Sequence, residues 1–99
     1  MDEAPGNSAR LPELFTPSRW VALGKRFRLS KRQKEIARLI CLGYSNTAIG
    51  KELGLRPDTV RMHNRELFKK LAIHQRIGVP VRLVIAERSL RLGRSDDPP

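Results

Sequence analysis

Residues 57–71, PDTVRMHNRELFKKL, constrain the fold of this chain most, because apolar side chains recur there at helical spacing. Wound as an α-helix at about 100° per residue, the stretch separates into two faces. The inner face carries Val60, Asn64, Leu67 and Leu71, with His63 at its edge. The outer face carries Asp58, Arg61, Met62, Arg65 and Lys69. The outer face is basic and nearly free of acid, which suits a helix that lies in the major groove of DNA.

Positive charge is concentrated in the centre of the chain. Residues 25–76 hold fourteen Lys or Arg against four acids and so supply the whole formal net charge of +10. Residues 1–24 carry a net charge of −1, and residues 77–99 carry +1. This distribution is expected of a surface that binds a polyanion. Double-stranded DNA is therefore the leading partner, with an anionic membrane surface or an acidic protein as the alternatives.

A chain of 99 residues forms one domain at most, with a small core. It has no apolar run of about 18 residues, so we expect no membrane span. The first residues lack the basic start and apolar centre of a secretory signal. The single cysteine, Cys41, can form no intramolecular disulfide, which fits a reducing compartment. We expect a cytoplasmic protein in which Cys41 is a small apolar residue rather than a nucleophile.

The two ends of the chain, residues 1–15 and 93–99, predict flexible tails. Thr16-Pro17 predicts the start of a short helix, and Gly24 predicts its end, so that residues 16–28 form a helix and a linker. Three residues of this segment are interpreted as packing residues: Trp20, Leu23 and Phe27.

Ser30 predicts the start of the next helix, because Gln33 follows it at the spacing of a capping box. Gly43 predicts the end of that helix. Its outer side gathers three basic residues, Lys31, Lys34 and Arg38. They are either a solvated charged face or phosphate contacts, and helical position does not decide between the two. Glu35 among them is interpreted as an anchor for a basic neighbour.

Two helices joined by a short glycine-containing turn come next, which is the helix-turn-helix pattern. Ser45 caps the first of them, residues 46–53, and residues 57–71 form the second. Arg56 is a poor N-cap, worth about 1 kcal/mol less than Ser, Thr or Asp. Gly50 within the first helix costs roughly 1 kcal/mol against Ala, which a close helix crossing would explain.

A set of residues at fixed spacings links these elements: Leu29-Ser30, Glu35, Ile36, Leu39-Ile40, Gly43, Ser45-Asn46, Ile49, Leu53-Gly54, Thr59-Val60, His63, Lys70-Leu71 and Arg76. Through them residues 29–85 resemble the C-terminal DNA-binding domain of LuxR-type (GerE/NarL-type) bacterial transcription regulators. Thr-Val-x-x-His followed by Lys-Leu is much more specific than a helix-turn-helix alone.

The resemblance implies an all-α, four-helix domain at residues 29–92, preceded by the short extra helix. Its helices are expected near residues 31–42, 46–53, 57–71 and 76–90. The positions that reach base edges correspond to Arg61, Met62 and Arg65. Those that hold DNA phosphates correspond to Ser45, Asn46, Thr59 and Lys69. His63 is interpreted as a packed or hydrogen-bonded structural residue, with a phosphate contact as the alternative, and we expect no metal and no cofactor.

The last helix departs most from the family, whose members use it to dimerise. Gly78 and Pro80 fall within its expected first turns, so we expect it to begin late, at about Pro80, or to be kinked there. Val81, Val84 and Ile85 still offer an apolar strip. The strip covers either the domain's own core or that of a partner, and we favour a homodimer.

The sequence thus predicts a regulator that binds specific sites on double-stranded DNA, with RNA polymerase as a further candidate partner. Such domains usually follow a receiver or ligand-binding module, so this chain resembles small stand-alone members or is a fragment. The fourth region of sigma factors is similar, but His63 and the helix after Arg76 favour the LuxR type. Two alternatives are a partner that dimerises with and blocks a full-length regulator, and a non-specific basic DNA-binding protein. An enzyme is not expected, since no phosphate loop, paired carboxylates or nucleophile with a base appear.

Overall fold

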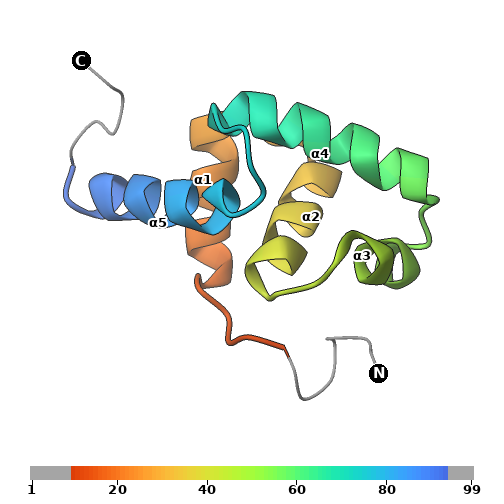
Figure 1. The fold of residues 1–99 in the computed structure, drawn as a ribbon. Coiled ribbons are helices and arrows are strands. Elements are labelled where there is room, and N and C mark those ends of the chain that lie inside the picture. Colours follow the sequence, from red (N-terminus) through yellow and green to blue (C-terminus); the bar gives the residue numbers. More distant parts are fainter. Residues whose placement is uncertain (1–9, 94–99) are drawn as a thin grey trace.

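The structure, a computed structural model, describes residues 10–93, which contain five helices and no strand (Figure 1). The helices are α1 (Pro17–Phe27), α2 (Lys31–Cys41), α3 (Asn46–Leu53), α4 (Pro57–Leu71) and α5 (Gly78–Arg91). The predicted all-α class is therefore confirmed, and α3 and α4 have the predicted bounds.

Side-chain caps mark the starts of α2 and α3. Ser30 Oγ accepts a hydrogen bond from the Gln33 backbone N–H at 3.1 Å, and Gln33 Oε1 accepts one from the Ser30 N–H at 2.9 Å. Ser45 Oγ accepts from the Ala48 N–H at 3.1 Å. Arg56 makes no side-chain cap, so α4 starts without this stabilisation, as predicted.

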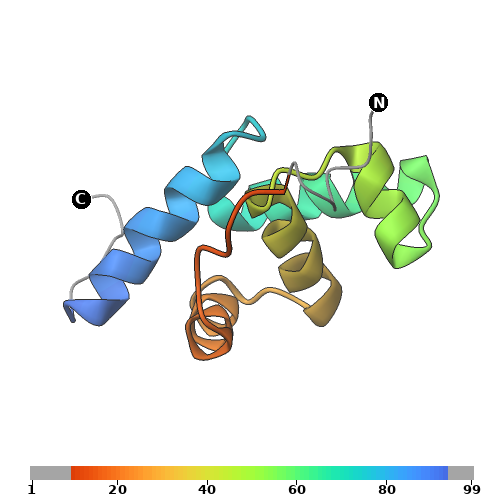
Figure 2. The same cartoon turned by 90° about the horizontal axis from the view of Figure 1, so that it is seen from below.

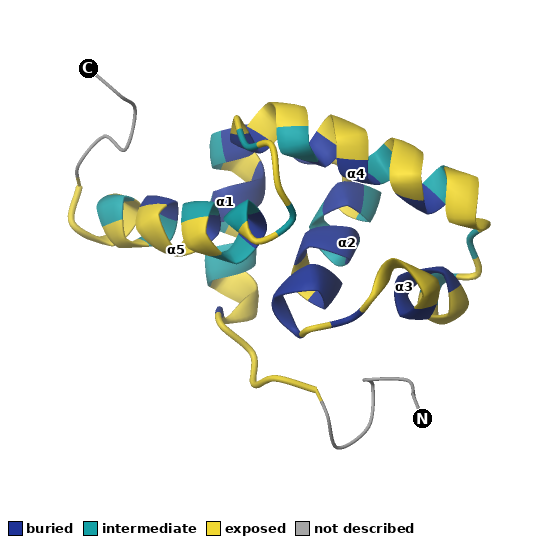
Figure 3. Ribbon diagram, viewed as in Figure 1, coloured by how far each residue is buried: buried dark blue, intermediate teal, exposed yellow. Residues whose placement is uncertain are grey.

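Helix α2 lies at the centre of the fold and packs against α3, α4 and α5 (Figure 1). Helix α1 packs against α5 (Figure 2). Each helix contributes to the fully buried core, with Leu23, Ile36, Ile49, Leu67 and Leu83 as examples. The buried positions lie where helices face one another, so α4 keeps one whole side exposed to solvent (Figure 3).

Gly50 allows a close approach, as predicted, but the neighbour is the turn rather than another helix. A Cβ at Gly50 would lie 2.8 Å from the backbone oxygen of Leu55. The Leu55 N–H donates to the Gly50 oxygen at 2.8 Å. Only a residue without Cβ lets the turn fold back this tightly.

The end of α1 differs from the prediction. Gly24 does not end the helix, which continues to Phe27 and terminates with Arg28 in the left-handed region at φ 55°. Gly24 is buried and faces α2, where a Cβ would lie 2.6 Å from Cδ of Lys34. The glycine thus serves the packing of α1 against the Lys34 stem rather than a turn.

Residues 10–15 are also placed differently, since we expected them to belong to a flexible tail. Phe15 is buried, and its ring lies 5.2 Å from that of Trp20 in an edge-to-face arrangement. The Leu11 N–H donates to the Leu42 oxygen at 2.9 Å. The prediction is wrong for this segment because its one aromatic side chain enters the core. The rest of the two predicted tails, apart from Gly93, lies outside the described residues.

Helix α5 begins at Gly78, two residues before the predicted late start at Pro80. Pro80 is the third residue of the helix, and backbone N–H groups of the first turn have no acceptor within the helix. The proline ring therefore removes no helical hydrogen bond there, and it does not delay the start.

Candidate nucleic-acid interface

Helix α4 separates into the two faces that its sequence predicts. Its buried side chains are Val60, Asn64, Leu67 and Leu71. Arg61, Met62 and Arg65 are all exposed on the other side, and Met62 is 49% exposed. We call Arg61, Met62, Arg65 and Lys69 the basic ridge. It is a convex, solvated surface on a helix whose opposite side is anchored in the core.

Acidic neighbours hold the cations of the basic ridge only weakly. Arg61 pairs with Asp58, but both side chains are largely exposed, and Lys69 Nζ lies 3.9 Å from an oxygen of Glu66. Exposed pairs of this kind contribute about 0–1 kcal/mol. The guanidinium group of Arg65 has no ion pair or hydrogen bond among residues 10–93. The guanidinium groups are therefore available to a ligand at little energetic cost.

The residues predicted to contact DNA phosphates lie at the starts of α3 and α4 and at the end of the basic ridge. Ser45 Oγ accepts the capping bond, which leaves its hydroxyl hydrogen free to donate. Asn46 uses its Oδ1 as an acceptor from Nδ2 of Asn64 at 2.9 Å, so its amide N–H₂ is also a possible donor. Thr59 is half-buried in the first turn of α4, and Lys69 is exposed.

Two polar residues that sequence reasoning gave no role position this surface. Asn64 is buried in the otherwise apolar stripe of α4 and joins it to the start of α3. Arg76 donates from Nη2 to the Tyr44 oxygen and lies 3.4 Å from Asn46 Oδ1. Burial lowers the pKa of the Arg76 guanidinium from its usual value. The sequence signal that could have indicated this role of Asn64 is its place, as a polar residue, within the apolar inner face of α4.

Lys70 also has an unpredicted role, at the end of α4. Its Nζ donates to the Arg28 backbone oxygen at 2.7 Å and to Gln33 Oε1 at 2.8 Å. The same Gln33 oxygen belongs to the capping box of α2. Lys70 therefore ties the end of α4 to the connection between α1 and α2. Nothing in the local sequence pattern indicates a contact over this separation.

The outer face of α2 lies away from the basic ridge. Lys31, Lys34 and Arg38 line a groove shared with residues 13–21, and no residue of α4 contributes to it. Arg38 donates from Nε to a carboxylate oxygen of Glu13 at 3.0 Å, which raises the pKa of Arg38 through that hydrogen bond. Glu35 pairs with Arg32 at 3.0 Å, which confirms its interpretation as an anchor. These contacts show that Arg38 and Glu35 are paired within the protein, and for Lys31 and Lys34 the choice between a solvated face and phosphate contacts stays open.

The apolar strip of α5 does not cover the domain's own core. Val81, Val84 and Ile85 are 53%, 45% and 51% exposed. The side of α5 that enters the core consists of Val79, Leu83 and Ala86. Of the two interpretations left open by the sequence, burial in the domain itself is therefore excluded.

Cys41 is buried, and burial is the main cause that raises the pKa of its thiol to about 12. It is therefore protonated at neutral pH and serves as a small packing residue, as interpreted. His63 is half-buried at the edge of the inner stripe. No group of His, Cys, Asp or Glu that could hold a metal ion occurs among residues 10–93.

Comparison with known families gives one match that covers more than half of the chain. Residues 28–83 match the family described as bacterial regulatory proteins, luxR family. No solved structure matches the chain with comparable significance. None of the helices in residues 10–93 has the length and apolar character needed to cross a membrane.

Several curated relatives share part of their sequence with this chain. One, from Escherichia coli (strain K12), carries the provisional name of HTH-type transcriptional regulator YhjB; it is 31% identical over 85 residues, covering 81% of this chain and 42% of the relative. The transcriptional regulatory protein UhpA of Salmonella typhimurium is 36% identical over 53 residues, covering 54% of this chain and 27% of UhpA. A nitrate/nitrite response regulator protein homolog of Haemophilus influenzae is 36% identical over 53 residues, covering 54% of this chain and 26% of the relative. The chain spans less than half the length of each of these relatives.

Proposed function

Because the chain belongs to the luxR family of bacterial regulatory proteins, we propose that it reads specific sequences of double-stranded DNA with α4 in the major groove. As a member it is a DNA-binding transcription regulator, and the family is not one of enzymes. The observation that carries the sequence-specific reading is the basic ridge: an exposed row of base-reading side chain types on a helix anchored by its opposite face.

The side chains of the basic ridge have defined chemistry toward base edges. Arg61 and Arg65 can each donate two hydrogen bonds to O6 and N7 of guanine, and Met62 can contact a thymine methyl group. Arg65 needs to break no ion pair to do so, and Arg61 only an exposed one. These three residues are the proposed source of sequence preference.

The proposed phosphate contacts fix the register of α4 without reading sequence. Ser45 and Asn46 each retain a free donor group at the start of α3, where the helix dipole also favours an anion. Thr59 and Lys69 extend these contacts along α4. With the contacts spread over α3 and α4, the protein would hold the duplex at the starts of both helices and at the Lys69 end of the basic ridge.

We further propose a homodimer formed through the exposed strip of α5. Val81, Val84 and Ile85 lie on one side of the helix at spacings of three and four residues, and a two-fold partner would cover them with the same strip. The resulting dimer would place two α4 helices about one turn of DNA apart. A regulator of this kind acts where the chromosome lies, so we infer a cytoplasmic location and RNA polymerase as a neighbour at promoters.

Selection of bound sequences from a random DNA pool, at about physiological salt, tests the proposal. We expect enrichment of an inverted repeat with half-sites about one helical turn apart. An enriched single half-site would support base reading and contradict the dimer. A pool that returns without enrichment would contradict base reading and favour a non-specific binder or a partner that blocks a full-length regulator. A variant with both Arg61→Ala and Arg65→Ala is the matched control, which should return no enrichment.

A further inference from the structure

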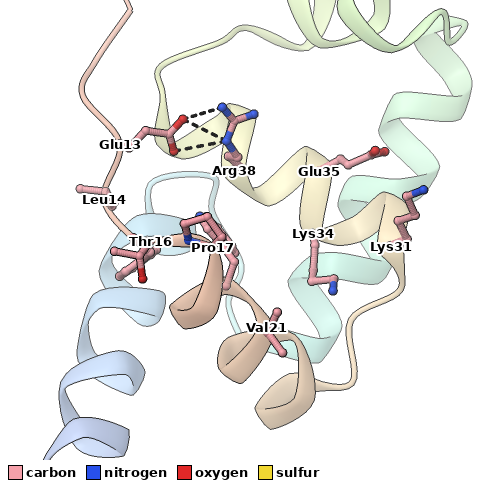
Figure 4. A pocket seen from close by; sticks show the side chains of 11 residues that line it. Glu13, Leu14, Thr16, Pro17, Val21, Lys31, Lys34, Glu35 and Arg38 are labelled. Atoms are coloured by element: carbon pink, nitrogen blue, oxygen red, sulfur yellow. Dashed lines mark hydrogen bonds and ion pairs between the residues drawn. The ribbon is translucent and has the colours of Figure 1, made fainter.

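A groove of about 830 Å³ lies on the side of the molecule formed by residues 13–21 and the outer face of α2 (Figure 4). Its apolar walls come from Leu14, Phe15, Pro17, Trp20 and Val21. The volume is that of a cavity for a small molecule, since ligand sites typically measure about 300–1,000 Å³. No residue of the basic ridge or of α5 lines it, so the groove is separate from both proposed interfaces.

The charges around this groove do not balance. The two acids that line it are already neutralised: Glu13 by Arg38, whose Nε lies 3.0 Å from a carboxylate oxygen, and Glu35 by Arg32 at 3.0 Å. The side chains of Lys31 and Lys34 line the same groove, and neither ammonium group has an ion pair or hydrogen bond among residues 10–93. The apolar groove thus carries two ammonium groups that no acid of residues 10–93 neutralises.

Lys34 is placed over the groove by its contact with α1. Its stem lies against the backbone of Gly24, where the missing Cβ leaves room for Cδ. Figure 4 shows the side chain pointing from α2 toward the part of α1 that carries Val21. A lysine whose stem is packed in this way loses less rotamer freedom when its ammonium group binds an anion. The indole Nε1 of Trp20 is buried and has no acceptor in the described part of the chain.

From these observations we propose that the groove binds a small amphipathic carboxylate, such as a medium-chain fatty acid. The apolar tail would lie against Trp20 and Val21, and the carboxylate would bind the ammonium groups of Lys34 and Lys31. An uncharged apolar ligand would leave both ammonium groups unpaired, and a second copy of this chain would bring a net charge of +10 against them. The ligand would bind without displacing DNA, because the basic ridge lies outside the groove.

Trp20 makes this proposal directly measurable, because it is the single tryptophan of the chain. We would titrate the whole protein with decanoate, below the concentration at which it forms micelles, and follow the tryptophan fluorescence. We expect a saturable change, with decanol as the uncharged control binding more weakly. Lys34→Met keeps the aliphatic stem over Gly24 and removes the charge, so it should weaken decanoate binding about three- to fivefold. Lys51→Met, on an exposed position of α3 outside the groove, should leave it unchanged.

Val21→Glu provides a second variant at an exposed position, where folding should be preserved, and we expect it to weaken decanoate binding about three- to fivefold by charge repulsion. A fluorescence change that does not saturate, or decanol binding as strong as decanoate binding, would overturn the proposal. So would equal affinities of Lys34→Met and Lys51→Met. The two measurements test the two proposals separately. A DNA pool without enrichment would contradict sequence-specific DNA binding and leave the decanoate titration unaffected, whereas a titration without saturation would contradict only the groove proposal.

Discussion

Asn64 in the middle of α4 donates a hydrogen bond from Nδ2 to Oδ1 of Asn46 at the start of α3, over 2.9 Å. Asn64 is buried, whereas Asn46 is exposed at the proposed DNA surface. A buried polar group that loses its partner is costly, so this bond favours one relative position of the two helices. Helices α3 and α4 are thus joined by a polar contact as well as by apolar packing.

Asn64→Ala should lower the free energy of unfolding by about 0.5–1.5 kcal/mol, because it removes this bond, whereas the Asn46 that is left is exposed to solvent and keeps a contact to Arg76. It should also weaken binding to preferred and random DNA alike, since Asn46 is then less well positioned. Urea unfolding and DNA titration measure the two effects. Glu66→Ala, on the exposed side of the same helix, should change stability by no more than about 0.5 kcal/mol. Equal stability of the two variants would contradict the positioning role.

Arg65→Ala should cost about 1–3 kcal/mol of binding free energy on the preferred DNA site and little on random DNA. Arg61→Ala should act in the same way. The reason is that bidentate contacts to guanine are lost only where a guanine is presented. Titration of both DNAs with each variant measures the difference, with Lys51→Ala as the basic control outside the proposed interface. Base reading by these residues is excluded if random DNA loses as much affinity as the preferred site.

Lys69→Ala should weaken binding to preferred and random DNA by the same factor, because a phosphate contact carries no sequence information. The slope of log affinity against log salt concentration should fall by about 1. Titrations over a series of salt concentrations measure this slope. An unchanged slope would show that Lys69 does not reach a phosphate.

Val84→Glu should convert the proposed dimer into a monomer, because it places a charge in the exposed strip of α5 without entering the core. The stability of the monomer should change by no more than about 0.5 kcal/mol. Sedimentation analysis of the protein alone and on DNA measures the oligomeric state. Val21→Glu, the same change at an exposed position of α1, should leave the oligomeric state as it is. A wild-type protein that is monomeric on its own and on an inverted repeat would contradict the dimer.

Cys41 should make stability depend on pH in the alkaline range. Burial raises the pKa of its thiol to about 12, so the folded protein holds this proton where the unfolded chain, with a thiol pKa near 9, has released it. The contribution of the Cys41 thiol to the free energy of unfolding is therefore fully present below about pH 9. The free energy of unfolding should fall by about 1.4 kcal/mol per pH unit as the pH rises from about 9 toward 12. Urea unfolding of wild type and Cys41→Ala across this range isolates the effect, and parallel pH profiles would contradict it.

Local patterns predicted much of the fold, because their determinants lie within a few residues of one another. The capping box at Ser30, the cap at Ser45 and the two faces of α4 all depend on spacings of three to four residues. The exposed position of the basic ridge follows from the same periodicity. Its assignment to base edges rested on the family resemblance and remains a prediction.

Contacts between distant segments were not predictable from the same patterns. Glycine is common at helix ends, so Gly24 predicted one, yet its role depends on its contact with Lys34 in the next helix. Phe15 lies in a stretch rich in polar residues, and only the position of Trp20 and the core gives it a place to pack. The groove beside α2 also requires two segments to come together, and no spacing within either of them indicates it.

Gln33 Oε1 accepts hydrogen bonds from the Ser30 N–H and from Lys70 Nζ, and these two donors differ greatly in their distance along the chain. The first lies three positions away and the second thirty-seven. Contacts between near neighbours close small loops and form early, whereas distant ones wait for large loops to close. We therefore expect the acceptor to be oriented by the Ser30 N–H before α4 packs against α2. In kinetic terms, replacing Gln33 should slow folding as well as speed unfolding, because it removes a contact on which a later assembly step depends.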